Sequence, residues 1–269
     1  MRSCATHCMV QRVGQVKPRS DASAVERTAD AIAYNIVAGR YRAGERLPSV
    51  RDLARVYGIN ASTVQVALAR LQESGFVTAH PRLGFVVRDI EQLGGIGTWR
   101  YVFRFAQQLP DRTLRICEEL LEMRRVLMAE AIQKIADHPK RYDAAPVRRA
   151  VERLEMVAAS TPRDTLEIAR AEFSATRLLM LAAGQSVVTA VLNSIAEIYL
   201  EVPVLVDALY ADPKRHIAQW HALLAAWERS DLPEQAGVEV RRVLRRYDVT
   251  VLDRLRERLA SRRPRRKSA

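Results

Sequence analysis

Cysteine is scarce in this sequence, aromatic residues are few, and no long uninterrupted apolar run is present. The three cysteines among 269 residues, Cys4, Cys8 and Cys117, are too few and too scattered for a disulfide framework. Residues 178–196 carry no charge, but Gly184 and several polar residues interrupt them, which favours two buried helices over a membrane span. The N-terminus lacks the apolar core of a secretory signal. We therefore expect a cytoplasmic protein with no membrane partner.

Motifs for enzymatic chemistry are also missing. Residues 96–260 contain only three histidines (His138, His216 and His221) and none of the motifs G-x-S-x-G, H-E-x-x-H or a glycine-rich phosphate loop. Near the N-terminus, the run from Cys4 to Cys8 includes His7 and could bind a metal, although an unstructured terminus explains it equally simply. The sequence predicts no enzymatic activity, no cofactor and no metal site.

The composition is that of a folded protein with a basic excess. Hydrophobic residues make up 48% and charged residues 28% of a chain long enough for two domains. The formal net charge is +12, and it is unevenly distributed. Residues 1–95 carry 13 Lys and Arg against 8 Asp and Glu, while residues 96–260 carry 25 against 23. The excess in the first part favours an anionic partner there, most often a nucleic acid.

Residues 47–87 show the pattern of two short helices, a tight turn and a β-hairpin. Ser49 has the spacing of an N-cap for the first helix, and Gly58 ends that helix where a reversal needs a positive φ. Asn60 is a suitable cap for the second helix, whose apolar residues recur at steps of three and four. Two short β-prone runs follow, separated by a turn at His80–Gly84. This order predicts a winged helix-turn-helix, in which the second helix enters the DNA major groove by its N-terminal end.

The run GRYRAGERLPSVRDLARVYGINASTVQVALARLQESGFV over residues 39–77 resembles the DNA-binding domain of the GntR family of bacterial transcription regulators. The resemblance implies DNA contacts from the first helix, the start of the recognition helix and the wing. By this resemblance and the helix pattern, the predicted DNA-binding residues are Arg51, Asn60, Ser62, Thr63, Gln65, His80 and Arg82. The family often has glycine where Arg82 stands and arginine where Ala61 stands, so the DNA half-site that is read would be unusual.

The positions of these motifs and of the glycines and prolines between them predict the domain boundaries. We predict a disordered leader at 1–22, the winged helix-turn-helix at 23–88, and a flexible linker at 89–97, where three glycines gather. Residues 98–260 show helical periodicity with breaks at prolines and no alternation of period two, which predicts an all-α bundle of six to eight helices. A basic tail, 261–269, is either solvated or an additional grip on DNA. The predicted fold class is mainly α: a winged helix-turn-helix followed by a helical bundle that binds an effector.

The bundle resembles the effector domain of the FadR branch of the same family, most clearly in EMRRVLMAEAI (122–132) and in 172–199. One subtype of that branch binds a metal through an Asp-x-x-Phe-His run, but Arg170 and Ser174 occupy its two ligand positions here. The resemblance to the metal-free subtype implies pocket roles for Arg124 and Tyr247. Asn193 and Tyr199 lie on a mostly apolar helix and could face the same cavity, or could simply be satisfied core residues.

These patterns favour a ligand-responsive regulator of transcription that binds a palindromic operator in double-stranded DNA as a homodimer, and we expect the commoner repressor type. By resemblance, the effector would be an organic acid or an acyl compound such as acyl-CoA, although Asp248 beside Tyr247 would repel a CoA phosphate. A non-specific DNA-architectural protein is the alternative, because the basic charge alone would permit it.

Overall fold

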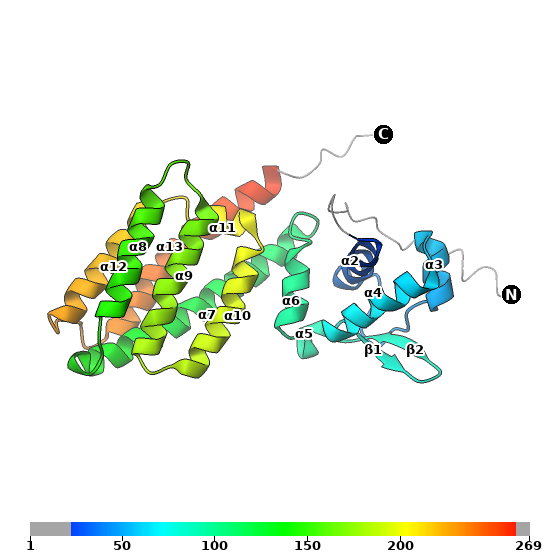
Figure 1. The fold of residues 1–269 in the computed structure, drawn as a ribbon, viewed down its shortest axis with the longest axis horizontal. Coiled ribbons are helices and arrows are strands. Elements are labelled where there is room, and N and C mark those ends of the chain that lie inside the picture. The colour runs from blue at the N-terminus through cyan, green and yellow to red at the C-terminus, as the bar shows by residue number, and fades with distance from the viewer. Residues whose placement is uncertain (1–22, 262–269) are drawn as a thin grey trace. The chain divides into compact units, whose positions relative to one another are not determined.

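The computed structural model describes residues 23–261, which form two compact units, 23–105 and 106–261 (Figure 1). Each unit is described by itself. The predicted leader at 1–22, with Cys4, His7 and Cys8, and almost all of the basic tail lie outside the described residues.

The first unit is a winged helix-turn-helix. In chain order its elements are α2 (Ala24–Val37), α3 (Val50–Tyr57), α4 (Ala61–Glu73), β1 (Val77–His80), β2 (Gly84–Val87), α5 (Ile90–Leu93) and α6 (Ile96–Phe103). The strands pair antiparallel, with Val77 opposite Val87 and His80 opposite Gly84. His80 therefore ends a strand, and the turn is shorter than the sequence suggested. Helix α2 packs on α4 through a core that includes Ile32, Leu68 and Leu71.

Local signals in the sequence set the helix ends in this unit. The Ser23 side chain accepts from the Glu26 amide while Glu26 bonds back to the Ser23 amide, which completes a capping box. The Ser49 hydroxyl caps α3 by accepting from the Asp52 amide at 3.2 Å. Gly58 ends α3 at φ +64, a conformation that glycine adopts without strain. Both predicted caps of the helix-turn-helix are present.

The segment 89–97 differs from the prediction of a flexible linker. The Asp89 carboxylate caps α5 by accepting from two backbone amides, and Ile90 is buried. Gly94 is needed for a close turn, because a Cβ there would lie 2.2 Å from the Ile90 carbonyl oxygen. Just beyond, the Thr98 hydroxyl donates to the Ser74 carbonyl at 2.6 Å. Of the three glycines, Gly94 therefore serves a close turn, and the unit extends to residue 105.

The second unit contains only helices within 106–261. They are α7 (Pro110–Asp137), a 3-10 turn η1 (Pro139–Arg141), α8 (Ala145–Ala159), α9 (Thr165–Ala182), α10 (Ser186–Leu200), α11 (Pro203–Leu209), α12 (Pro213–Glu228) and α13 (Ala236–Ser261). Four of the predicted proline breaks begin a helical element, because proline at the first position needs no amide donor. The prediction of a mainly α protein with a small hairpin wing is confirmed.

Between residues 23 and 261, no single helix has both the length and the apolar character needed to cross a membrane. Helices α10 and α11 reach those values only when counted together, and they are bent by 103°.

Helix α13 packs along α7 over much of its length (Figure 1). The close approach occurs at Gly237, which is buried. A Cβ at that position would lie 2.7 Å from the Ala129 carbonyl oxygen and 3.1 Å from the Gln133 Cβ. The Gly237 amide also donates to the Gln133 side chain at 3.0 Å. The start of α13 is therefore fixed against α7 by a contact that admits no side chain.

We predict that Gly237→Ala lowers the free energy of unfolding by about 1–3 kcal/mol, because overpacking against a backbone carbonyl outweighs the gain in helix propensity. Urea denaturation measures this change. Val238→Ala at the adjacent exposed position is the control and should change stability by less than about 0.5 kcal/mol. A Gly237→Ala protein as stable as this control would contradict the close packing.

Candidate functional sites

The N-terminal end of α4 forms a compact polar cluster. The Asn60 side-chain oxygen accepts from the Thr63 amide at 2.7 Å, from the Ser62 hydroxyl at 2.9 Å and from the Thr63 hydroxyl at 2.6 Å. Three of the predicted DNA-binding residues are thus joined around one helix cap. Both hydroxyl hydrogens are used within the cluster, so contact with a phosphate would require them to turn outward. Backbone amides in the first turn of α4 supply further donors for an anion.

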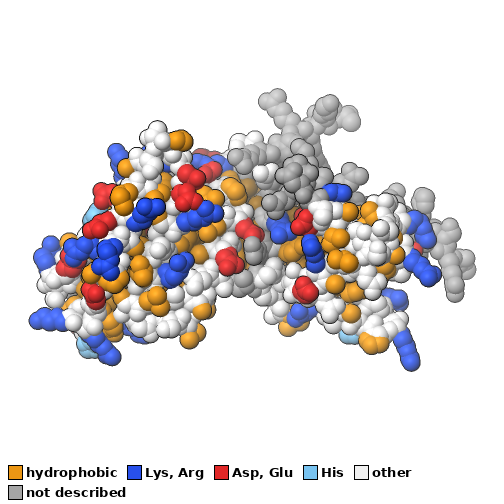
Figure 2. Space-filling view, viewed as in Figure 1, with side chains coloured by type: hydrophobic (Ala, Val, Ile, Leu, Met, Phe, Trp, Pro, Cys, Tyr) orange, Lys and Arg blue, Asp and Glu red, His pale blue; other side chains and the backbone are white. Residues whose placement is uncertain are grey.

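The other four predicted DNA-binding residues lie on α3, α4 and the hairpin. Arg51, Gln65, His80 and Arg82 are all exposed. Arg51 forms no ion pair or hydrogen bond with any described residue, whereas Arg55, one turn later, is paired with Asp52 at 3.2 Å. Arg side chains project from the surface over this part of the first unit (Figure 2). The arrangement offers free cations and a helix N-terminus to a polyanion.

Arg82 at the tip of the hairpin has an unusual backbone. Its φ is +66, and Arg82 is one of two non-glycine residues with positive φ among residues 23–261. This is the position at which the family often has glycine. A side chain in the left-handed region costs about 1–2 kcal/mol, so the chain keeps this arginine against a conformational penalty.

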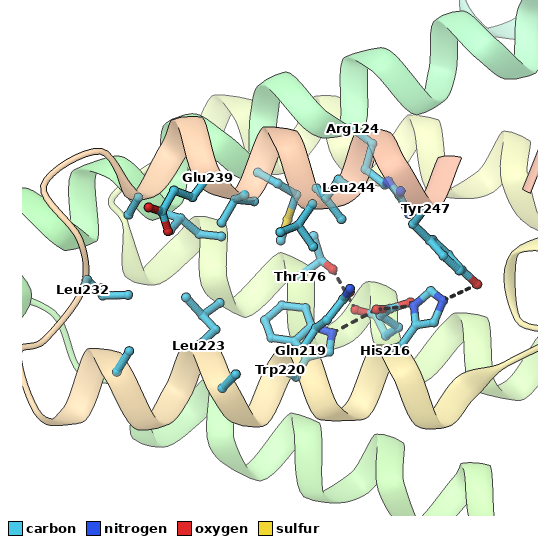
Figure 3. Close-up of a pocket in the computed structure, with 18 of the residues that line it drawn as sticks. Arg124, Thr176, His216, Gln219, Trp220, Leu223, Leu232, Glu239, Leu244 and Tyr247 are labelled. Carbon is cyan, nitrogen blue, oxygen red and sulfur yellow. Dashed lines mark hydrogen bonds and ion pairs between the residues drawn. The ribbon is translucent and has the colours of Figure 1, made fainter. Parts of the chain in front are cut away.

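The second unit contains a cavity of about 310 Å³ between α7, α9, α12 and α13 (Figure 3). Most of its wall is apolar. The apolar lining includes Met128, Ile132, Phe173, Leu192, Leu223, Leu232, Val240, Val243 and Leu244. Polar side chains gather at one end, around Arg124, His216 and Tyr247, while Leu232 and Glu239 lie at the other (Figure 3). Such a shape suits a small organic molecule with one polar group.

Glu172 is the centre of the polar end. Its carboxylate accepts from the Trp220 indole at 2.9 Å and from His216 Nδ1 at 3.0 Å, and it also bonds the Tyr210 hydroxyl. Burial alone would raise the pKa of Glu172, but the His216 ring and the other donors outweigh burial and hold that pKa at about 2. On the far side of His216, Nε2 lies 2.9 Å from the Tyr247 hydroxyl, which donates to the Leu209 carbonyl.

Arg124 also faces the cavity, but it is already paired with a carboxylate of the chain. Asp248 is buried and bonds Arg124 Nη2 and Arg125 Nη1, each at 2.5 Å. Burial acts to lower the pKa of Arg124, but the Asp248 carboxylate together with Tyr199, Glu172 and Tyr210 outweighs burial and raises that pKa. The Nε of Arg124 is buried without a hydrogen-bond partner in the described part of the chain.

Of the four predicted effector residues, the structure brings two together. Arg124 and Tyr247 line the polar end of the cavity, and Asn193 and Tyr199 do not line it. Asn193 is exposed and accepts from Arg177 Nε at 2.7 Å. Tyr199 is buried and packs edge-on against Phe173 at 5.7 Å, which places it behind the cavity wall. The helical phase of α10, which the apolar pattern alone left open, decides both positions.

The sequence reading missed Glu172, His216 and Trp220 as cavity residues. One signal was available: His216 and Trp220 are four residues apart on α12, and so share a face with the apolar positions. The described residues contain no cluster of three or more His, Cys, Asp or Glu side chains that could hold a metal.

Comparison with known proteins gives matches for both units. The model of "Bacterial regulatory proteins, gntR family" matches residues 24–87, and the model of the FCD domain matches residues 119–246. The uncharacterised HTH-type transcriptional regulator YjiR of Escherichia coli is 42% identical over 62 residues, which are 23% of this chain and 13% of YjiR. The uncharacterised HTH-type transcriptional regulator Rv0494 of Mycobacterium tuberculosis is 43% identical over 68 residues, 25% of this chain and 28% of that protein. The chain thus spans less than a third of the length of either relative.

Among solved structures, a GntR-family transcriptional regulator from Pseudomonas syringae is 17% identical, with 97% of this chain and 98% of that chain covered and a TM-score of 0.40. Lar of Listeria monocytogenes is 16% identical, with 90% and 99% covered and a TM-score of 0.45. Neither likeness is close enough to bear on function.

We predict that Arg82→Gly is more stable than Arg82→Ala by about 1 kcal/mol, because glycine adopts φ +66 without the Cβ penalty. Thermal unfolding of the two variants measures the difference. Leu83, the next residue, does not have a positive φ, and therefore Leu83→Gly and Leu83→Ala should show no such gain for glycine. Equal stability of the two Arg82 variants would show that the tip does not hold this conformation in solution.

We predict that Glu172→Gln destabilises the protein by about 3 kcal/mol at neutral pH and by progressively less in acid. The pKa of Glu172 in the folded protein, about 2, lies below its usual value of 4.5. The stabilisation is therefore complete above pH 4.5 and is lost as the pH falls towards 2. Urea unfolding from pH 7 down to pH 3 measures the difference between wild type and variant. Glu167→Gln, at an exposed position on the same helix, is the control. If the loss of stability in Glu172→Gln stayed constant with pH, Glu172 would not be ionised in the folded protein.

Proposed function

We propose that this chain, which belongs to the GntR family and carries an FCD domain after its helix-turn-helix, is a ligand-responsive transcriptional regulator. Both relatives are named HTH-type transcriptional regulators, and neither name points to an enzyme. The observation that carries the proposal is the pairing of two features in one chain. The first unit presents the exposed N-terminal end of α4, and the second encloses a mainly apolar cavity.

The DNA-binding step follows from the first unit. The N-terminal end of α4 would enter the major groove, with Ser62, Thr63 and Gln65 near phosphates and base edges. Arg51 would contact the backbone from α3, and His80 and Arg82 would contact it from the hairpin. Two copies of the chain would form a homodimer and read a palindromic operator, with half-sites about one helical turn apart. Such a protein would act where the DNA is, in the cytoplasm expected from the sequence.

The regulatory step follows from the second unit. A small molecule in the cavity would bind more tightly to one dimer geometry than to the other, and so would shift the population that fits the operator. We propose that the protein represses transcription and is released from DNA by its effector. The resemblance suggested an organic acid or an acyl compound as effector. At about 310 Å³ the cavity is near the lower end of small-molecule sites, so an acyl-CoA could not be enclosed by it.

Selection from a random pool of DNA duplexes tests the DNA-binding proposal. We expect the full chain to enrich an inverted repeat. Arg51→Ala should weaken binding to the selected duplex about tenfold or more, with unchanged circular dichroism, because one exposed cation at the interface is lost.

Arg149→Ala is the matched control, because Arg149 is an exposed arginine on α8 of the second unit. It removes the same charge and should change affinity less than about twofold. Equal affinities for the two variants would remove Arg51 from the interface. A pool without any enriched sequence, bound with a steep salt dependence, would favour the architectural alternative.

A further inference from the structure

The charges that face the cavity are few and are largely balanced. Arg124, Glu172 and Glu239 are its charged lining residues, with His216 beside Glu172. Glu239 is exposed at the far end, away from the polar cluster (Figure 3). The polar end therefore presents one cation and one carboxylate to a ligand, with Arg125 and Asp248 directly behind them.

The cation is already occupied by a carboxylate of the chain itself. Both oxygens of Asp248 are used, one by Arg124 and one by Arg125, and the side chain of Asp248 is only 2% exposed. An acidic ligand that approached Arg124 would meet Asp248 on the same guanidinium. It would have to share the charge with that carboxylate or displace it, and displacement would leave a buried anion without its partner.

The second carboxylate, Glu172, opposes an acid as well. It accepts from three donors, which leaves few N–H or O–H groups at this end for another anion. It lies in the same low-dielectric pocket, where like charges repel strongly. The unused donor is of a different kind. Gln219 lines the cavity, and its side-chain amide has no hydrogen-bond partner among the described residues.

We propose that the effector is an uncharged, mainly apolar molecule with one acceptor group, such as a carbonyl, that bonds the Gln219 amide, and that the site selects against carboxylates. This inference rests on the proposed function, because it concerns the effector of the proposed regulator. It departs from the organic acid that the resemblance suggested. The reason is specific to this chain: Asp248 and Glu172 supply the anions that an acidic ligand would otherwise bring.

Two fluorescent probes with the same ring system test the charge preference. N-phenyl-1-naphthylamine is uncharged at neutral pH, and 8-anilinonaphthalene-1-sulfonate adds a sulfonate to the same rings. We expect the full-length protein to bind the uncharged probe at least about tenfold more tightly. Leu244→Trp, which fills the cavity from α13, should abolish binding of the uncharged probe and so locate it in the cavity.

A charge-removing variant tests the cause. Asp248→Asn removes the carboxylate that bonds Arg124 and Arg125. The variant should bind the sulfonate probe more tightly, so that the ratio of affinities for the uncharged and the sulfonate probe falls at least about fivefold. If Asp248→Asn does not fold, Glu172→Gln provides the same test, because it removes the other carboxylate with little change of shape. An unchanged preference in the folded variant would show that these carboxylates do not cause it.

The outcomes for the inference and for the proposed function differ. If the sulfonate binds as tightly as the uncharged probe, and both are lost in Leu244→Trp, the inference is overturned and the sensor function stands. If neither probe binds, the ligand-responsive part of the proposed function fails and the inference fails with it. The selection of a DNA sequence is independent of both results.

Discussion

The bond between Asp248 and two arginines is the constraint on which the second unit depends most. It joins α13 to α7 across 124 residues of sequence, in the interior of the helical bundle. A buried ion pair of this kind adds little net stability compared with apolar packing, but breaking it leaves an unpaired charge and is costly. Its effect is therefore to specify one register of α13 on α7, and the close contact at Gly237 requires the same register. The Asp248 ion pairs and the close contact at Gly237 thus agree on one register between α7 and α13, the two longest helices.

The same bond determines the chemistry of the cavity. Arg124 is the cation that an acidic ligand would use, and in this chain it is matched before any ligand arrives. Glu172 repeats the arrangement on α9, where His216 and Trp220 of α12 and Tyr210, which follows α11, surround one carboxylate. Each buried ion is satisfied within the chain, as buried charges must be. When the charged groups at the polar end are already bonded to each other, a single unused donor can still orient a ligand. The ligand is then held by a hydrogen bond and not by an ion pair.

Much of the fold followed from local sequence rules. The caps at Ser49 and Asn60, the glycine turn at Gly58 and the proline helix starts were predictable because each depends on a few neighbouring residues. The short helix α5 inside the segment predicted as a linker was not foreseen, because glycine has two uses, flexibility and close packing. At Gly94 the contact with the Ile90 carbonyl decides between them, and composition does not show this contact. In the cavity, Arg124 and Tyr247 were found by resemblance, whereas Asn193 depended on a helical phase that a uniformly apolar pattern leaves undefined. Glu172 was missed because its donors His216 and Trp220 lie 44 and 48 residues away.

Asp248 shows why a family resemblance does not transfer a ligand. From the sequence alone, an acidic residue beside Tyr247 counted only against a CoA phosphate. The structure shows that its carboxylate points to Arg124 and Arg125 and is hidden from solvent. The residue therefore changes the site in a different way, because it neutralises the cation instead of repelling a distant phosphate. An uncharged ligand that bonds the Gln219 amide would leave both bonds of Asp248 intact. A ligand carboxylate would compete with Asp248 for Arg124. The charge of the effector thus decides whether binding preserves or weakens the central contact of the bundle.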